Sequence, residues 1–83
     1  MDFNCLATAD RGTAELRVGH SNTLAGWTSA TDVVPDATGA DAGGIVSYVV
    51  DTVSEAPLNK VTATIDSSAA AGGKLFGRLE ATE

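Results

Sequence analysis

The amino-acid sequence predicts an all-β fold, namely a small antiparallel β-sandwich or open barrel of about six to seven strands. Short runs of alternating or β-branched residues recur about every 8–12 residues, and Gly, Pro, Asp and Ser separate them. No stretch repeats apolar residues at helical spacing over a useful length. The alternative is a β-rich α+β fold in which residues 21–26 or 67–71 form a helix. With 83 residues, the chain is expected to form one β-domain over residues 1–83.

The first part of the chain predicts a β-hairpin. Residues 3–9 form a weak strand, and residues 10–13 supply a turn that contains glycine. Residues 14–20 alternate well, with Leu16 and Val18 on one face. The two runs are therefore expected to pair across the turn.

A compact corner and a third strand follow. Residues 21–26 predict a tight corner from which Leu24 and Trp27 point back to the core. Residues 27–34 predict a strand that ends at Pro35, and small residues then form a long loop up to Gly44.

The second half contains the clearest strands. Residues 45–53 are β-branched and apolar on both faces, which predicts a central strand. Residues 61–65 alternate cleanly, with Val61, Ala63 and Ile65 facing inward. Residues 75–81 predict the last strand, which places Phe76 and Arg78 on one face. Arg78 is then expected to pair with a carboxylate such as Asp51 or Asp66.

Composition excludes several classes of function. The formal net charge of −6 leaves no surplus of cations to neutralise phosphates, which argues against nucleic acids and anionic membranes as partners. One cysteine cannot form an internal disulfide, and one histidine does not suit a zinc site. No apolar run approaches the ~20 residues that span a bilayer, and residues 1–5 lack the pattern of a signal peptide. No cofactor is expected.

Three motifs suggest chemistry, but each has a stronger structural interpretation. Residues 19–23 resemble a nucleophile elbow, yet Thr23 replaces the final glycine, and His20 and Ser21 are adjacent in a strand and point apart. Residues 72–74 resemble the end of a phosphate loop, but they precede a strand and predict a hairpin turn. Paired glycosidase carboxylates would need a cleft that so small a fold hardly offers.

The acidic loop over residues 32–41 contains three aspartates that invite a calcium hypothesis. Asp32, Asp36 and Asp41 supply oxygen ligands, but the spacing of a calcium loop is missing. A solvated loop is the expected interpretation. Whether the loop binds calcium is left open by the sequence.

Two aromatic residues are the candidates for a ligand-binding surface. Trp27 and Tyr48 could stack on a sugar ring, although a small core is expected to need Trp27 inside. Tyr48 is the better candidate for exposure. Cys5 is expected to be a buried small apolar group.

The residues also resemble a known type of module. Residues 16–28 end in the pattern Leu-x-x-Trp-Thr, and residues 59–65 and 73–79 carry the patterns V-T-x-T-I and K-L-F-x-R-L. Together they resemble the small β-sandwich module at the extreme C-terminus of large exported proteins of environmental bacteria, over residues 14–82. The resemblance implies no catalytic residues and an exported or cell-surface location. It departs at the start, because Met1 opens the chain just before the first strand.

The function expected from these observations is that of a non-catalytic structural or interaction module. Its partner would be protein, either a second copy or a longer parent chain, that pairs with an exposed edge strand. A weak glycan-binding module is the first alternative and a small enzyme the second.

Overall fold

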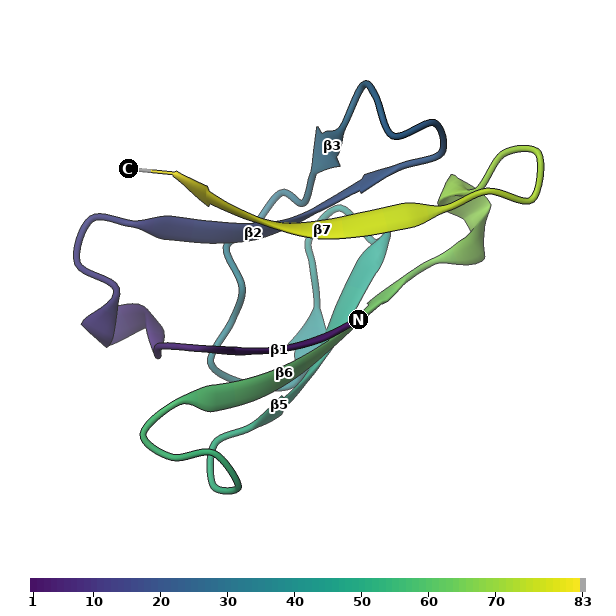
Figure 1. Ribbon diagram of the computed structural model, residues 1–83. Coiled ribbons are helices and arrows are strands. Elements are labelled where there is room, and N and C mark those ends of the chain that lie inside the picture. Colours follow the sequence, from purple (N-terminus) through teal and green to yellow (C-terminus); the bar gives the residue numbers. More distant parts are fainter. Residues whose placement is uncertain (83) are drawn as a thin grey trace.

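The computed structural model describes residues 1–82 and shows two antiparallel sheets, so the predicted all-β fold is confirmed. One sheet has the strand order β1-β6-β5-β4, and the other has the order β3-β2-β7. Figure 1 shows the two sheets as separate layers, the smaller one above the larger, which is a sandwich. The strands are β1 (Asp2–Cys5), β2 (Glu15–Ser21), β3 (Thr28–Ser29), β4 (Gly39–Ala40), β5 (Val46–Asp51), β6 (Asn59–Ile65) and β7 (Phe76–Thr82).

Helical structure in residues 1–82 is limited to two 3₁₀ turns, η1 (Thr8–Asp10) and η2 (Ser67–Ala69). The alternative α+β fold is therefore wrong. Ser21 ends β2 and residues 22–26 form a bend, because the Ser21 hydroxyl donates to the Ala25 carbonyl and closes the corner without a helix. None of the helical segments described is long and apolar enough to cross a membrane.

The core lies between the facing surfaces of the two sheets. Its four largest fully buried side chains are all valines, and they come from β2, from the segment before Pro35, from β5 and from β6: Val18, Val34, Val46 and Val61. β-Branched side chains pack well on a pleated surface, and burying each one contributes about 1.5–3 kcal/mol. The expected inward faces of residues 14–20 and 61–65 are confirmed, since Leu16 and Ile65 pack against this cluster.

The pairing of the first strand differs from the predicted hairpin. β1 ends at Cys5 and pairs with β6 in the larger sheet, while β2 pairs with β3 and β7 in the smaller one. The intervening loop crosses between the layers, and Arg11 holds it by donating to the carbonyls of Leu6 and Val34 at 2.8 Å each. In this position β1 buries Cys5, as expected, and packs Phe3 against the core.

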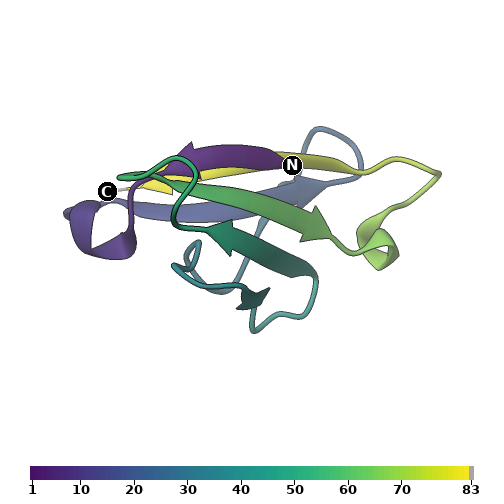
Figure 2. The ribbon, with the colours of Figure 1, turned by 90° about the horizontal axis from the view of Figure 1, so that it is seen from below.

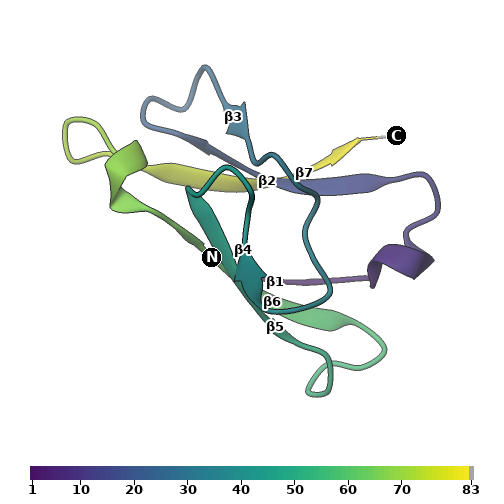
Figure 3. The ribbon, with the colours of Figure 1, turned by 180° about the vertical axis from the view of Figure 1, so that it is seen from behind.

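The segment from Trp27 to Gly44 is also less regular than predicted. Only Thr28–Ser29 forms a strand, although the chain stays beside β2 through bonds from Ala30 N to the Val18 carbonyl and from Val34 N to the Leu16 carbonyl. The following loop contains β4, a two-residue edge strand on β5. Figure 3 shows this crossover from β3 through β4 to β5. β5 therefore has a strand on each side, as expected for a central strand.

Tyr48 is buried, so the expectation that it is exposed is wrong. Its side chain shares the inward face of β5 with Val46, and its exposed fraction is 2%. Among the described residues the Tyr48 hydroxyl has no hydrogen-bond partner. Burial, with the nearby negative charges of Asp41 and Asp32, raises the pKa of Tyr48 to about 12.

Removing the Tyr48 hydroxyl is expected not to weaken the fold. Tyr48→Phe should leave the free energy of unfolding unchanged or raise it by up to about 1 kcal/mol, because the buried hydroxyl has no partner to lose. Ser21→Ala is the matched control and should cost about 1 kcal/mol, because its buried hydroxyl contacts Ala25 O at 2.6 Å and Thr23 N at 3.2 Å. Urea denaturation measures both, and equal losses would contradict the prediction.

Alkali is expected to destabilise the protein through Tyr48, the only tyrosine of the chain. The unfolded chain releases the phenol proton near pH 10, whereas the folded protein holds it to about 12. Stability is therefore constant with respect to this group below pH 10 and is lost as the pH rises toward 12. Tyrosinate absorbance against pH measures the titration. Tyr48→Phe should abolish that loss of stability, and a midpoint at 10 in the folded protein would refute the prediction.

Candidate functional site

β7 is the longest unpaired edge in the described part of the chain. It has seven residues and pairs only with β2. The other edge strands are shorter, with four residues in β1 and two each in β3 and β4. A long edge strand leaves a row of backbone donors and acceptors free to pair with another strand. This edge is therefore the first candidate for an interaction surface.

The backbone groups that face the free edge follow from the hydrogen bonds of β2. Val18 accepts from Ala30 on the β3 side, and backbone groups of successive residues in a strand alternate in direction. Val18 stands opposite Leu79 in the register with β7. The N–H and C=O groups of Leu79 therefore point away from β2, and the same holds for the residues two positions before and after it, Gly77 and Ala81.

An apolar groove lies beneath this edge. Its volume is about 320 Å³, and its lining residues come from both layers and from the loop between them: Asn4, Cys5, Leu6, Arg11, Ala14, Leu16 and Leu79. Leu79 is 39% exposed and Leu6 44% exposed, although Leu79 lies on the inner face of β7 beside the fully buried Val18. Figures 1 and 2 show β1 and β7 on the same side of the molecule, one in each layer. The sandwich is thus apolar and open on the side of the free edge.

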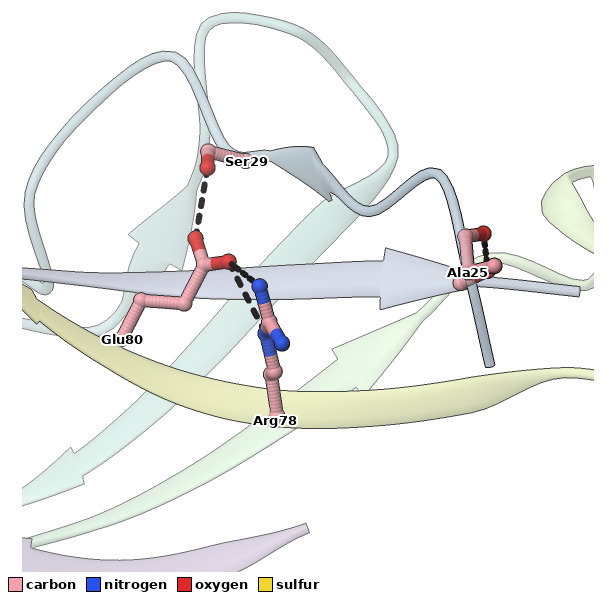
Figure 4. A network of polar contacts seen from close by, with 5 residues as sticks. Ala25, Ser29, Arg78 and Glu80 are labelled. Carbon is pink, nitrogen blue, oxygen red and sulfur yellow. Dashed lines mark hydrogen bonds and ion pairs between the residues drawn. The ribbon is translucent and has the colours of Figure 1, made fainter. Parts of the chain in front are cut away.

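The outer face of β7 carries a small polar network (Figure 4). Glu80 accepts from the Ser29 hydroxyl at 2.5 Å and from Arg78 Nε and Nη2 at 3.0 and 2.9 Å. The bond from Ser29 and the pairing with Arg78 hold the pKa of Glu80 below its ordinary value, against a smaller opposing effect of burial. Arg78 in turn lies over the Trp27 ring, 4.2 Å from its centroid.

This network corrects two expectations. Arg78 pairs with Glu80 on its own strand, not with Asp51 or Asp66, because residues two apart in a strand share one face. Trp27 is half-buried and lies outside the core cluster. Its ring is covered by the Arg78 guanidinium and not by the valine core.

The aromatic candidates for sugar stacking are separated by the fold. The Trp27 ring has the Arg78 guanidinium over one face, and Tyr48 is enclosed between the sheets. The two rings therefore form no common platform.

Leu24, which was expected in the core, is 62% exposed at the corner and has a positive φ of 63°.

His20 and Ser21 do not form a nucleophile–base pair. They are neighbours in β2, so their side chains leave opposite faces of the sheet. The Ser21 hydroxyl donates to Ala25 O and accepts from Thr23 N, which fixes the corner. The predicted hairpin turn at Gly72 and Gly73 is confirmed, because both have positive φ and the flanking residues bond to each other.

The aspartates of the acidic loop bind backbone N–H groups. The buried Asp41 carboxylate accepts from Thr31 N, Asp32 N and Gly43 N at 2.7–3.1 Å. Asp36 accepts from the N–H and hydroxyl of Thr8, which lowers its pKa. Across residues 1–82, no three His, Cys, Asp or Glu side chains gather in a way that could hold a metal ion.

The sequence did not allow the free edge strand to be identified. It predicted the last strand within one residue and an exposed edge strand in general, but not that β7 is that strand. A signal was present, because Gly77, Leu79 and Ala81 are small or apolar while Arg78 and Glu80 alternate with them. This pattern is typical of a strand with one face over a groove and one in solvent.

Gly19 is expected to be required for the Glu80 network. A Cβ there would lie 2.7 Å from the Glu80 carboxylate, whereas a Cβ at Gly39 would meet nothing within 4 Å. Gly19→Ala should therefore be less stable than Gly39→Ala by about 1 kcal/mol, because Glu80 loses its bonds to Ser29 and Arg78. Urea denaturation measures the difference. Carboxyl NMR should show the Glu80 pKa rising toward its ordinary value only in Gly19→Ala, and an unchanged pKa would refute the proposed contact.

Comparisons with models of known families, with curated proteins and with solved structures find no match for this chain. The resemblance to a C-terminal module of exported proteins therefore stays a prediction. Function is inferred from the geometry and charges of the chain itself.

Proposed function

We propose that the protein is a non-catalytic interaction module that binds an extended polypeptide strand along the free edge of β7. The strand would come from a second copy or from a longer exported chain to which the module belongs. The observation that carries this proposal is the seven-residue edge with an apolar groove at its central residue, Leu79.

The backbone of the edge supports strand addition. Gly77, Leu79 and Ala81 each present one donor and one acceptor to the outside, and no proline interrupts β7. Main-chain hydrogen bonds give affinity in this mode of recognition, and pockets for alternate side chains give specificity.

The groove supports the same mode of binding. Alternate side chains of an added strand would point to the inner side, where Leu79, Leu6 and Leu16 leave apolar surface accessible. Covering apolar surface contributes about 25 cal/mol per Å². The added strand would thus close the open side of the sandwich.

Strand addition should be visible residue by residue in the amide NMR spectrum. The probe is a capped heptapeptide of alternating Thr and Val, which offers a strand backbone without charge. The amides of Gly77, Leu79 and Ala81 should shift and become protected from exchange, because they gain partners. The amides of Arg78 and Glu80 already point to β2 and serve as internal references. The titration uses a protein concentration at which sedimentation shows only monomer, so that the edge of β7 is free. No response of β7 under this condition, or an equal response of all five amides, would refute the proposal.

A matched pair of lysine variants provides the control. Leu79→Lys places a charge at the groove and should abolish peptide binding, because an inward-pointing charge blocks an edge. Val49→Lys makes the same kind of change on the solvent face of β5, where Val49 is 60% exposed, and should bind as the unmodified protein does.

A further inference from the structure

We infer that the strand bound by β7 is β7 of a second copy, paired antiparallel about a twofold axis at Leu79. This inference rests on the proposed function and names the partner of that same edge. It follows from the direction of the backbone groups, from the length of the strand and from the order of its charges.

Backbone direction restricts the possible registers. The outward groups belong to Gly77, Leu79 and Ala81, so these residues must meet the same set on the partner. When Leu79 stands opposite the partner subunit's Leu79, Gly77 stands opposite the partner subunit's Ala81. Phe76 then aligns with the partner subunit's Thr82, so this register uses the whole of β7.

Charge selects the same register. With Leu79 at the centre, Arg78 stands directly opposite the partner subunit's Glu80, and Glu80 opposite the partner subunit's Arg78. These are non-hydrogen-bonded positions, where side chains approach most closely. A shift by one step in either direction places Arg78 against the partner subunit's Arg78, or Glu80 against the partner subunit's Glu80. Like charges directly opposite are destabilising, so only the central register has two attractive pairs.

The inner face gains from the same arrangement. The twofold axis brings Leu79 beside the partner subunit's Leu79, so that the two apolar grooves adjoin. Both copies use the same surface, and such an isologous contact closes at two subunits. The two three-stranded sheets would become one continuous six-stranded sheet.

Reversing the charge of Arg78 or of Glu80, and then mixing the two variants, tests the register. Arg78→Glu alone and Glu80→Arg alone each create two like-charge pairs, so each should raise the dimer dissociation constant by about tenfold or more. An equimolar mixture should restore association, because each glutamate then faces an arginine of the other variant. Sedimentation velocity over a concentration series measures all three samples.

Controls separate this effect from net charge and from folding. Lys60→Glu and Glu55→Arg make the same changes in charge at exposed positions away from β7 and should associate as the unmodified protein does. The double variant R78E/E80R keeps the pair within the strand and should also dimerise. Circular dichroism verifies the fold of each variant.

The remaining outcomes have distinct meanings. A monomer at every concentration would overturn self-pairing, whereas a response of the β7 amides to the Thr-Val peptide would still support the proposed function. A dimer that both single variants form equally well would overturn the register. Failure of both the peptide and the self-association experiments would overturn the two proposals together.

Discussion

The burial of four valines between the two sheets is the interaction on which the rest of the structure depends. These side chains come from both layers and are fully enclosed, and the single cysteine is free, so no disulfide adds to them. A domain of this size buries only about 60% of the surface of its unfolded chain. A core of valines is also thin and cannot extend under every strand. The apolar groove beside β7 agrees with this limit, because Leu79 lines it together with residues of both layers and stays 39% exposed.

Polar side chains hold the loops that so small a core cannot fix. Asp41 accepts hydrogen bonds from three backbone N–H groups of the crossover between β3 and β5. Asp36, in the same crossover, accepts from the N–H of Thr8 in η1. Arg11 connects the loop after β1 to the crossover by donating to the carbonyl of Val34. Each bond satisfies a backbone group that a loop would otherwise leave to solvent. The carboxylates that invited a calcium hypothesis thus stabilise the chain's own backbone. On the outer face, Glu80 binds side chains instead, and its bond from the Ser29 hydroxyl joins β7 to β3 across Gly19.

Local pattern was sufficient for the elements that alternate strongly. β2, β6 and β7 were predicted to within a residue or two, and the inward faces of β2 and β6 were predicted with them, because side-chain alternation is a property of each strand alone. The partner of β1 could not be predicted in this way, since pairing with β6 depends on a contact nearly 60 residues away in the sequence. The predicted locations of the two aromatic residues were wrong for a related reason. Trp27 and Tyr48 each have an apolar body and a polar atom, so composition permits either location and only the neighbours decide.

The charges on β7 decide whether its edge repels or attracts a strand of a second copy. Natural proteins often place charge on an edge strand so that copies repel one another. Two charges of one sign would have that effect on β7, but Arg78 and Glu80 have opposite signs and stand symmetrically about Leu79. This order repels a second copy in the neighbouring registers and attracts it in one. The net charge of −6 acts against every register equally, over about 8–10 Å at ordinary salt. General repulsion combined with one attractive register would suppress open-ended aggregation while permitting a single closed pair, which is what the proposed pairing of β7 requires.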